Sequence, residues 1–98
     1  MNRFVVGIEG AQPDHEEAFR KWITDNGLGF WHWIPHFWIL HSLYGTHTVI
    51  SLRDKIMQLF PTMNIVVIEI KGNPVMWSGY GPNQPDHNMF TWLKQNMD

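Results

Sequence analysis

The segment Asn64-Ile65-Val66-Val67-Ile68-Glu69-Ile70 decides the fold of this chain, because it is a β-branched run of the length of a strand. Side chains alternate between the two faces of a strand. Ile65 and Val67 therefore share one face, and Val66, Ile68 and Ile70 share the other. Both faces are apolar, so a sheet that contains this strand needs cover on each side.

Two amphipathic helices can cover one of these faces. The first is predicted over residues 14–26, with Asp14 as its N-cap and Glu17 three residues on in capping-box spacing. The second follows the N-cap Thr48 and ends before Pro61. Its apolar residues recur at helical spacing: Val49, Leu52, Ile56, Leu59 and Phe60.

The rest of the chain supplies further strands and one more helix. Residues 4–8 predict a first strand, and residues 29–41 predict one long aromatic strand with a bulge near Pro35. Residues 75–77 predict a fourth, short strand, residues 78–86 a loop, and residues 88–96 a last short helix. The predicted order is β-α-β-α-β-β. The tetrapeptide Gln-Pro-Asp-His at residues 12–15 and 84–87 precedes a predicted helix each time, which indicates a repeated helix-entry device.

Composition limits the classes of protein. A chain of 98 residues is one domain, 1–98, and a net charge of −2 argues against coating nucleic acid by bulk positive charge. A hydrophobic content of 44% with 16% charged residues is typical of a folded protein, and no apolar stretch has the length of a membrane helix. Because the chain has no cysteine, we expect no disulfide or thiolate site and a cytoplasmic location.

The second apolar face of the strand predicts a partner. If both helices cover one face, a second copy of the sheet is the simplest cover for the other, so we expect a homodimer. The predicted interface residues are Ile65, Val66, Val67 and Ile68. The alternative is a monomer in which the aromatic segment or the C-terminal helix folds back over that face.

Several stretches together resemble a known family. They are residues 29–33, 37–40, 52–56 and 64–70 with the motif Trp77-Ser78-Gly79-Tyr80, and they are similar to SinR-like proteins. Those are similar in turn to the small CRISPR-associated endoribonuclease subunit of the spacer-acquisition complex. The resemblance implies a ferredoxin-like fold. Together with the predicted elements, this gives an α+β ferredoxin-like sandwich with a mostly antiparallel sheet, two main helices on one face, and a C-terminal loop and short helix that wrap the edge. The resemblance also implies a homodimer packed sheet to sheet.

The resemblance also bears on function. The CRISPR-associated relatives carry an Asp at the end of their first strand, which binds a divalent metal for phosphodiester cleavage. Glu9 stands at the matching place here, and no Asp lies near it on that strand. The leading hypothesis is therefore a binding protein, a catalytically weak or inactive relative that engages nucleic acid or a nucleotide in phage or bacterial defence. The alternatives are a metal-dependent phosphodiesterase and a protein-interaction or inhibitor dimer.

Few residues are candidates for chemistry. Glu9 is the candidate catalytic carboxylate, and with its copy across a dimer axis it would hold Mg²⁺ or Mn²⁺ only if the nuclease alternative is right. The six histidines fit no zinc signature, so we predict no metal site for them. No cofactor is otherwise expected.

Three residues are candidates for ligand contact. Arg53 and Lys55 are two of only seven basic residues and lie within one helical turn. Tyr80 stands on the glycine-containing loop, where an aromatic ring could stack on a base. Arg53 could instead pair with a carboxylate across the fold, and Tyr80 could cap the core.

Overall fold

The computed structural model describes residues 2–97 and forms an α+β domain. Its elements follow the order β1 (Asn2–Ile8), α1 (Pro13–Asp25), β2 (Leu28–Ile34), β3 (Phe37–Ser42), α2 (Val49–Leu59), β4 (Ile65–Ile70), β5 (Asn83–Gln84), β6 (His87–Asn88) and α3 (Thr91–Asn96). No helix within this range is long and apolar enough to cross a membrane.

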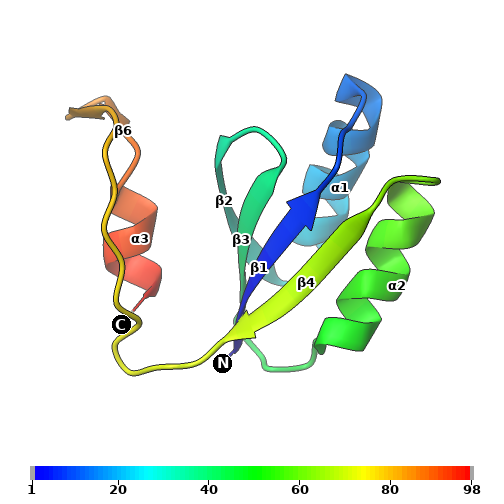
Figure 1. The fold of residues 1–98 in the computed structure, drawn as a ribbon. Helices are drawn as coiled ribbons and strands as arrows, with labels where there is room; N and C mark the ends of the chain where they lie inside the picture. Colours follow the sequence, from blue (N-terminus) through cyan, green and yellow to red (C-terminus); the bar gives the residue numbers. More distant parts are fainter. Residues whose placement is uncertain (1, 98) are drawn as a thin grey trace.

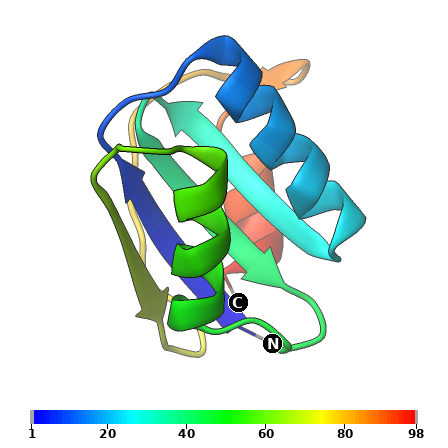
Figure 2. The same ribbon diagram turned by 90° about the vertical axis from the view of Figure 1, so that its right-hand side faces the viewer.

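The first four strands form one antiparallel sheet in the order β2-β3-β1-β4. Helices α1 and α2 lie together on one side of this sheet, and α3 lies on the opposite side (Figures 1 and 2). We call the side under α1 and α2 the inner face and the opposite side the outer face. The predicted antiparallel α+β class with two helices on one face is thus confirmed.

The inner face carries the main core. Alternate residues of β1 point to the helices, and Phe4 and Val6 have no exposed surface. They pack against Phe19 of α1 and Leu52 of α2, which are also fully buried. The alternation in β4 follows the prediction, because Ile65 and Val67 pack against this core while Val66 and Ile68 are exposed.

The prediction of one long strand over residues 29–41 is wrong. The segment is a hairpin in which β2 and β3 pair antiparallel, with Pro35 and His36 as the turn between them. His36 has a φ of 66°, in the left-handed region, and this reverses the chain where we expected only a bulge. The order is therefore β-α-β-β-α-β followed by the C-terminal elements, and the predicted β-α-β-α-β-β order is also wrong.

The C-terminal part differs from the prediction as well. Residues 75–77 pair with no strand, and the last helix begins at Thr91 rather than at residue 88. The second Gln-Pro-Asp-His, at residues 84–87, forms the turn of the small β5–β6 hairpin and not a helix N-terminus. The chain here does not wrap the edge of the sheet; it packs on the outer face over β2 and β3 (Figure 1).

The two long helices begin close to their predicted starts. Ser51 N donates to the Thr48 hydroxyl over 3.1 Å, so Thr48 caps α2 as expected. Helix α1 begins at Pro13, one residue early, and its N-cap is Gln12 instead of Asp14. The Gln12 backbone N–H donates to Nδ1 of His15 over 3.4 Å, so His15 takes the part that we assigned to Glu17.

Candidate functional site: an apolar groove on the outer face

The outer face has its own small core, built by the C-terminal segment, residues 75–97. Trp31 of β2 and Ile39 of β3 are buried under Met89, Leu93 and Met97 of that segment. This second core covers only the β2–β3 half of the face. The apolar side chains of the other half, on β1 and β4, have no such layer above them.

Hydrogen bonds anchor the C-terminal segment to the strands and tie its two ends together. The Trp31 indole N–H donates to the Met89 carbonyl over 2.7 Å, and the Val75 N–H donates to the Met97 carbonyl over 2.7 Å. Arg3 Nε donates to the Asn96 carbonyl at the C-terminus of α3. A cation at this end of a helix also interacts favourably with the helix dipole. The segment is therefore held at both of its ends and in its middle.

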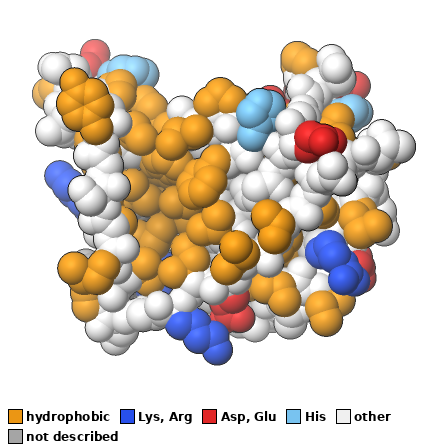
Figure 3. All heavy atoms as spheres, in the orientation of Figure 1, with side chains coloured by type: hydrophobic (Ala, Val, Ile, Leu, Met, Phe, Trp, Pro, Cys, Tyr) orange, Lys and Arg blue, Asp and Glu red, His pale blue; other side chains and the backbone are white. Residues whose placement is uncertain are grey.

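Between this segment and the strands lies a groove of about 570 Å³, which we call the outer groove. Its floor is formed by strand residues, and residues 75–80 form a wall along one side. Figure 3 shows hydrophobic side chains gathered in this hollow. The side chains that line it are Val5, Trp31, Ile34, Phe37, Ile39, Ile70, Val75, Met76, Trp77, Ser78, Tyr80, Met89, Phe90, Leu93 and Met97.

The chemistry of the outer groove is aromatic and uncharged. None of its lining residues carries a formal charge, and its polar side-chain groups are the hydroxyls of Ser78 and Tyr80 and the indole N–H groups. Trp77 stacks on Phe90 with ring centroids 6.0 Å apart, whereas the Tyr80 ring is fully exposed at the rim. Such a surface can bind flat apolar groups, and it offers no cation to a phosphate.

Glycine lets the wall of the groove approach the layer beneath it. A Cβ on Gly79 would stand 2.9 Å from the Phe90 ring, closer than a real Cβ contact. A Cβ on Gly81 would stand closer still to the Met89 sulfur. Any side chain at these positions would push the loop outward and change the width of the groove.

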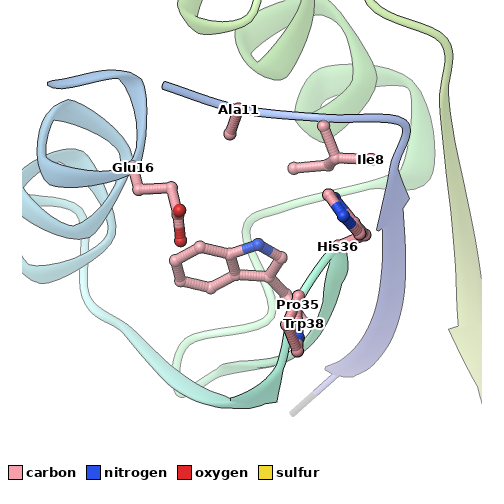
Figure 4. Close-up of a pocket in the computed structure, with 6 residues that line it drawn as sticks. All are labelled: Ile8, Ala11, Glu16, Pro35, His36 and Trp38. Carbon is pink, nitrogen blue, oxygen red and sulfur yellow. The ribbon is translucent and has the colours of Figure 1, made fainter. Parts of the chain in front are cut away.

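A second, much smaller cavity of about 40 Å³ lies between α1 and the β2–β3 turn (Figure 4). Glu16, His36 and Trp38 point into it. Nearby, His32 stacks flat on Trp38 with centroids 3.7 Å apart, and its ring nitrogens lie 2.8 Å from Glu16 Oε1 and 2.8 Å from the Phe37 carbonyl. A space of this size holds water at most, so we assign it a structural role in fixing the hairpin to α1.

The candidate catalytic carboxylate, Glu9, bridges two strand ends. It accepts hydrogen bonds from the Asn64 amide group at 2.9 Å and from the Asn64 backbone N–H at 3.3 Å. No group of three or more His, Asp or Glu side chains within residues 2–97 is arranged to hold a metal ion.

Most of the histidines instead contact aromatic rings: His15 with Phe60, His32 with Trp38, His41 with Trp92, His47 with Trp22 and His87 with Trp33.

The surroundings of His41 change its titration. It is buried on the outer face of β3, directly opposite Arg3 of β1. Burial, and then the positive charge of Arg3, lower the pKa of His41. Both effects favour the neutral imidazole, whose ring lies edge-on to Trp92 of α3 with centroids 6.4 Å apart.

The structure does not bring the three predicted ligand-contact residues together. Arg53 and Lys55 lie on α2, on the inner side of the sheet, whereas Tyr80 lines the outer groove. Arg53 pairs with the neighbouring Asp54 at 2.9 Å, and the Lys55 ammonium lies 6.0 Å from the centre of the Trp22 ring. Tyr80 does not cap the core, because it is exposed.

The four predicted interface residues belong to both faces of β4. Ile65 and Val67 pack toward α2, while Val66 and Ile68 lie on the outer face. The C-terminal helix folds back over β2 and β3, while β4 keeps its exposed apolar side chains.

Sequence reasoning missed the outer groove as a site. A signal was available in the apolar spacing of Met89, Phe90, Leu93 and Met97, which shows that the last helix has a face to bury.

No protein-family model, curated protein or solved structure matches this chain, so the site has to be interpreted from its own chemistry.

Proposed function

We propose that this chain is a homodimeric binding protein of ferredoxin-like fold that holds a flat, uncharged apolar group in the outer groove. The strand order β2-β3-β1-β4 with two crossover helices supports the fold assignment, because ferredoxin-like domains are built from a split β-α-β arrangement of this kind. The exposed apolar residues of β4 support the homodimer.

The outer groove is the observation that carries the binding function. Ligand sites typically have volumes of roughly 300–1,000 Å³ and apolar, aromatic walls, and the groove, at about 570 Å³, fits this description. Rings at the rim can stack on a flat group, and the thioethers of Met76 and Met89 can adapt to its outline.

The charges favour a lone ring over a nucleic-acid strand. The groove lining has no Lys or Arg, and several basic side chains elsewhere face carboxylates of their own helix: Arg20 with Glu16, Lys21 with Asp25 and Arg53 with Asp54. Neutralising a phosphate chain requires a row of available cations. A nucleobase-like or other heteroaromatic group without phosphates therefore fits the groove better than an oligonucleotide.

A catalytic centre is not part of this proposal. Glu9 as a metal-binding catalytic residue stays a prediction, tested by incubating RNA and DNA with Mg²⁺ or Mn²⁺ and comparing the protein with its Glu9→Gln variant. Cleavage that disappears in the variant would replace the binding proposal with the phosphodiesterase alternative.

The binding proposal is tested with N-phenyl-1-naphthylamine, an uncharged aromatic probe that becomes fluorescent in apolar sites. We expect saturable binding, weakened about fivefold or more in Tyr80→Ala, since one aromatic stacking contact contributes about 1–3 kcal/mol. Tyr44→Ala is the matched control, because Tyr44 is the only other tyrosine and is exposed in the loop before α2.

Equal affinities of the two tyrosine variants would show that the probe does not bind in the outer groove. A parallel titration with single-stranded DNA and RNA separates the candidate ligands. Strong, salt-sensitive oligonucleotide binding would contradict the uncharged-ligand proposal, and no binding of any probe would favour the protein-interaction alternative.

A further inference from the structure

Strand β4 has a neighbour on one side only, because it is the last strand of the sheet order and pairs with β1. Edge strands in proteins are usually protected by a bulge, a proline or an inserted charge. At the opposite edge, β2 has a register shift between Trp31 and Ile34. The sequence of β4, Ile-Val-Val-Ile-Glu-Ile, contains no proline or glycine, and its register with β1 is unbroken. Glu69 is its only charged residue, so a partner at this edge has to provide a cation for it.

The pairing with β1 fixes which backbone groups face the free edge. The Glu9 N–H donates to the Asn64 carbonyl over 2.9 Å, which makes these two a hydrogen-bonded pair. Such pairs alternate along antiparallel strands. Val66 and Ile68 therefore direct their backbone groups to β1, and Ile65, Val67 and Glu69 direct theirs to the edge. No strand within residues 2–97 pairs with that edge.

Apolar side chains flank this edge on both faces of the sheet. On the outer face, Val66 is 54% and Ile68 55% exposed. On the inner face, a groove of about 230 Å³ runs between α2 and β4, and Ile50 at its side is 58% exposed. Arg53 is the only charged residue that lines this groove.

We propose that a second copy of the chain adds to this edge, with its own β4 antiparallel about a two-fold axis at Val67. The inference rests on the homodimer part of the proposed function and specifies its interface. Val67 then faces the partner's Val67, and Ile65 faces the partner's Glu69. These are the residues whose backbone groups are directed to the edge, and this register sets all three of them opposite one another within β4, which gives the most hydrogen-bonded pairs.

The same register matches the charges. Arg53 and Ile65 line the same groove, so the partner's Glu69, opposite Ile65 on the same face, comes to the groove that holds the guanidinium. The two-fold axis forms this ion pair twice. Glu69 has no ion-pair partner among residues 2–97, and Arg53 has only the exposed, adjacent Asp54. On the outer face, Val66 meets the partner's Ile68, which covers both exposed side chains.

The shape of the outer face favours this edge over sheet-to-sheet packing. Residues 75–80 stand beside the sheet as a wall, so the face is hollow rather than flat (Figure 3). Two hollow faces do not interlock. Edge addition leaves both outer grooves open on one continuous sheet, where they can bind ligand.

Charge reversal with sedimentation equilibrium tests the proposal. The protein should be a dimer at micromolar concentration, and Arg53→Glu and Glu69→Arg should each weaken dimerisation at least tenfold, because each places like charges together. The double variant Arg53→Glu/Glu69→Arg should restore most of the affinity. Lys55→Glu is the matched control, with the same change of charge on the same helix but over the Trp22 ring.

A single introduced thiol tests the axis directly, since the natural chain has no cysteine. Opposite residues of a hydrogen-bonded antiparallel pair have Cα atoms about 5.5 Å apart, within the range of a disulfide. Oxidised Val67→Cys should therefore form a covalent dimer, whereas Met57→Cys, exposed on α2, reports random collision.

The outcomes separate the two proposals. A wild-type monomer at all concentrations overturns both the homodimer and the β4 edge. A wild-type dimer that the charge reversals leave intact, and that Val67→Cys does not cross-link above the Met57→Cys level, overturns the edge while the homodimer stands. The ligand groove is measured independently by the two tyrosine variants.

Discussion

The inner and outer faces of this sheet are made by the same four strands but are covered very differently. Two helices of 13 and 11 residues cover the inner face, and the side chains between them are almost completely buried. On the outer face, a six-residue helix and a loop cover β2 and β3, whereas the apolar side chains of β4 are exposed.

We infer from this difference that the inner face provides most of the stability of the domain and that the outer face provides its binding surface. The inner core joins residues from both long helices and the strands of the sheet, so it unfolds only with the whole domain. The outer cover is one segment at the end of the chain, anchored to the strands through the Trp31–Met89 and Arg3–Asn96 hydrogen bonds. Segments with few buried contacts open locally at a lower cost than global unfolding. We therefore expect the outer face to move, bind and adapt while the inner face stays fixed.

The largest expected effect comes from a tryptophan of the inner face. Trp38 is 1% exposed, packs edge-on against Phe19 at 4.8 Å and stacks on His32, so Trp38→Ala should lower the free energy of unfolding by about 3–5 kcal/mol. Trp77→Ala, at the half-exposed rim of the outer groove, should cost much less. Urea denaturation measures both, and similar losses would contradict the separation of the two faces.

A smaller and local effect is expected from the outer cover. Leu93→Ala removes a buried side chain of α3, at a cost of about 2 kcal/mol. Hydrogen exchange should accelerate at the amides of α3 and at Val75 and stay unchanged in β1. Leu43→Ala, at an exposed leucine, is the matched control. Uniform acceleration across the sheet would mean that the outer segment unfolds only with the whole domain.

The inner face was the part that the sequence predicted well. Alternation in residues 64–70 and helical spacing in the two long helices each depend on neighbours within one element, and those local patterns identified α1, α2 and β4. The β2–β3 hairpin was missed because the aromatic residues on both sides of Pro35 continue one β-type composition. The decisive feature is the left-handed backbone of His36, which is uncommon for residues other than glycine and which composition does not reveal.

The repeated Gln-Pro-Asp-His shows the same limit. At residues 12–15 it starts α1, where the apolar residues that follow can bury a face against the sheet. At residues 84–87 it forms a hairpin turn, because Pro and Asp suit both structures and the packing of Met89 on Trp31 sets the path of the chain. One tetrapeptide therefore takes two conformations according to what lies beneath it.

The candidate site depends on contacts distant in sequence, so little of it was predictable. Tyr80 was singled out and lines the groove, but two other lining residues, Trp31 and Phe37, come from the hairpin that we expected to be one strand. Arg53 and Lys55 were grouped with Tyr80 only through charge and loop composition. Arg53 and Lys55 lie on the inner side of the sheet and Tyr80 on the outer side, because α2 crosses over the inner face (Figure 1). Spacing along the chain does not specify the side on which a helix crosses.

The smallest effect concerns the pH response of the outer face. The pKa of His41 is lowered in the folded protein by burial and by Arg3, whereas the unfolded chain has the ordinary value of about 6.5. Below that value the unfolded state binds more protons than the folded state, so stability falls as the pH falls from about 6.5 through the folded pKa and is fully present above it. One proton allows a slope of at most about 1.4 kcal/mol per pH unit.

His41→Gln should flatten this part of the curve of unfolding free energy against pH. Since His41 lies against Trp92, hydrogen exchange in α3 should also accelerate at low pH in the wild type and less so in the variant. Identical pH curves for the two proteins would show that burial of this imidazole does not couple the outer cover to pH.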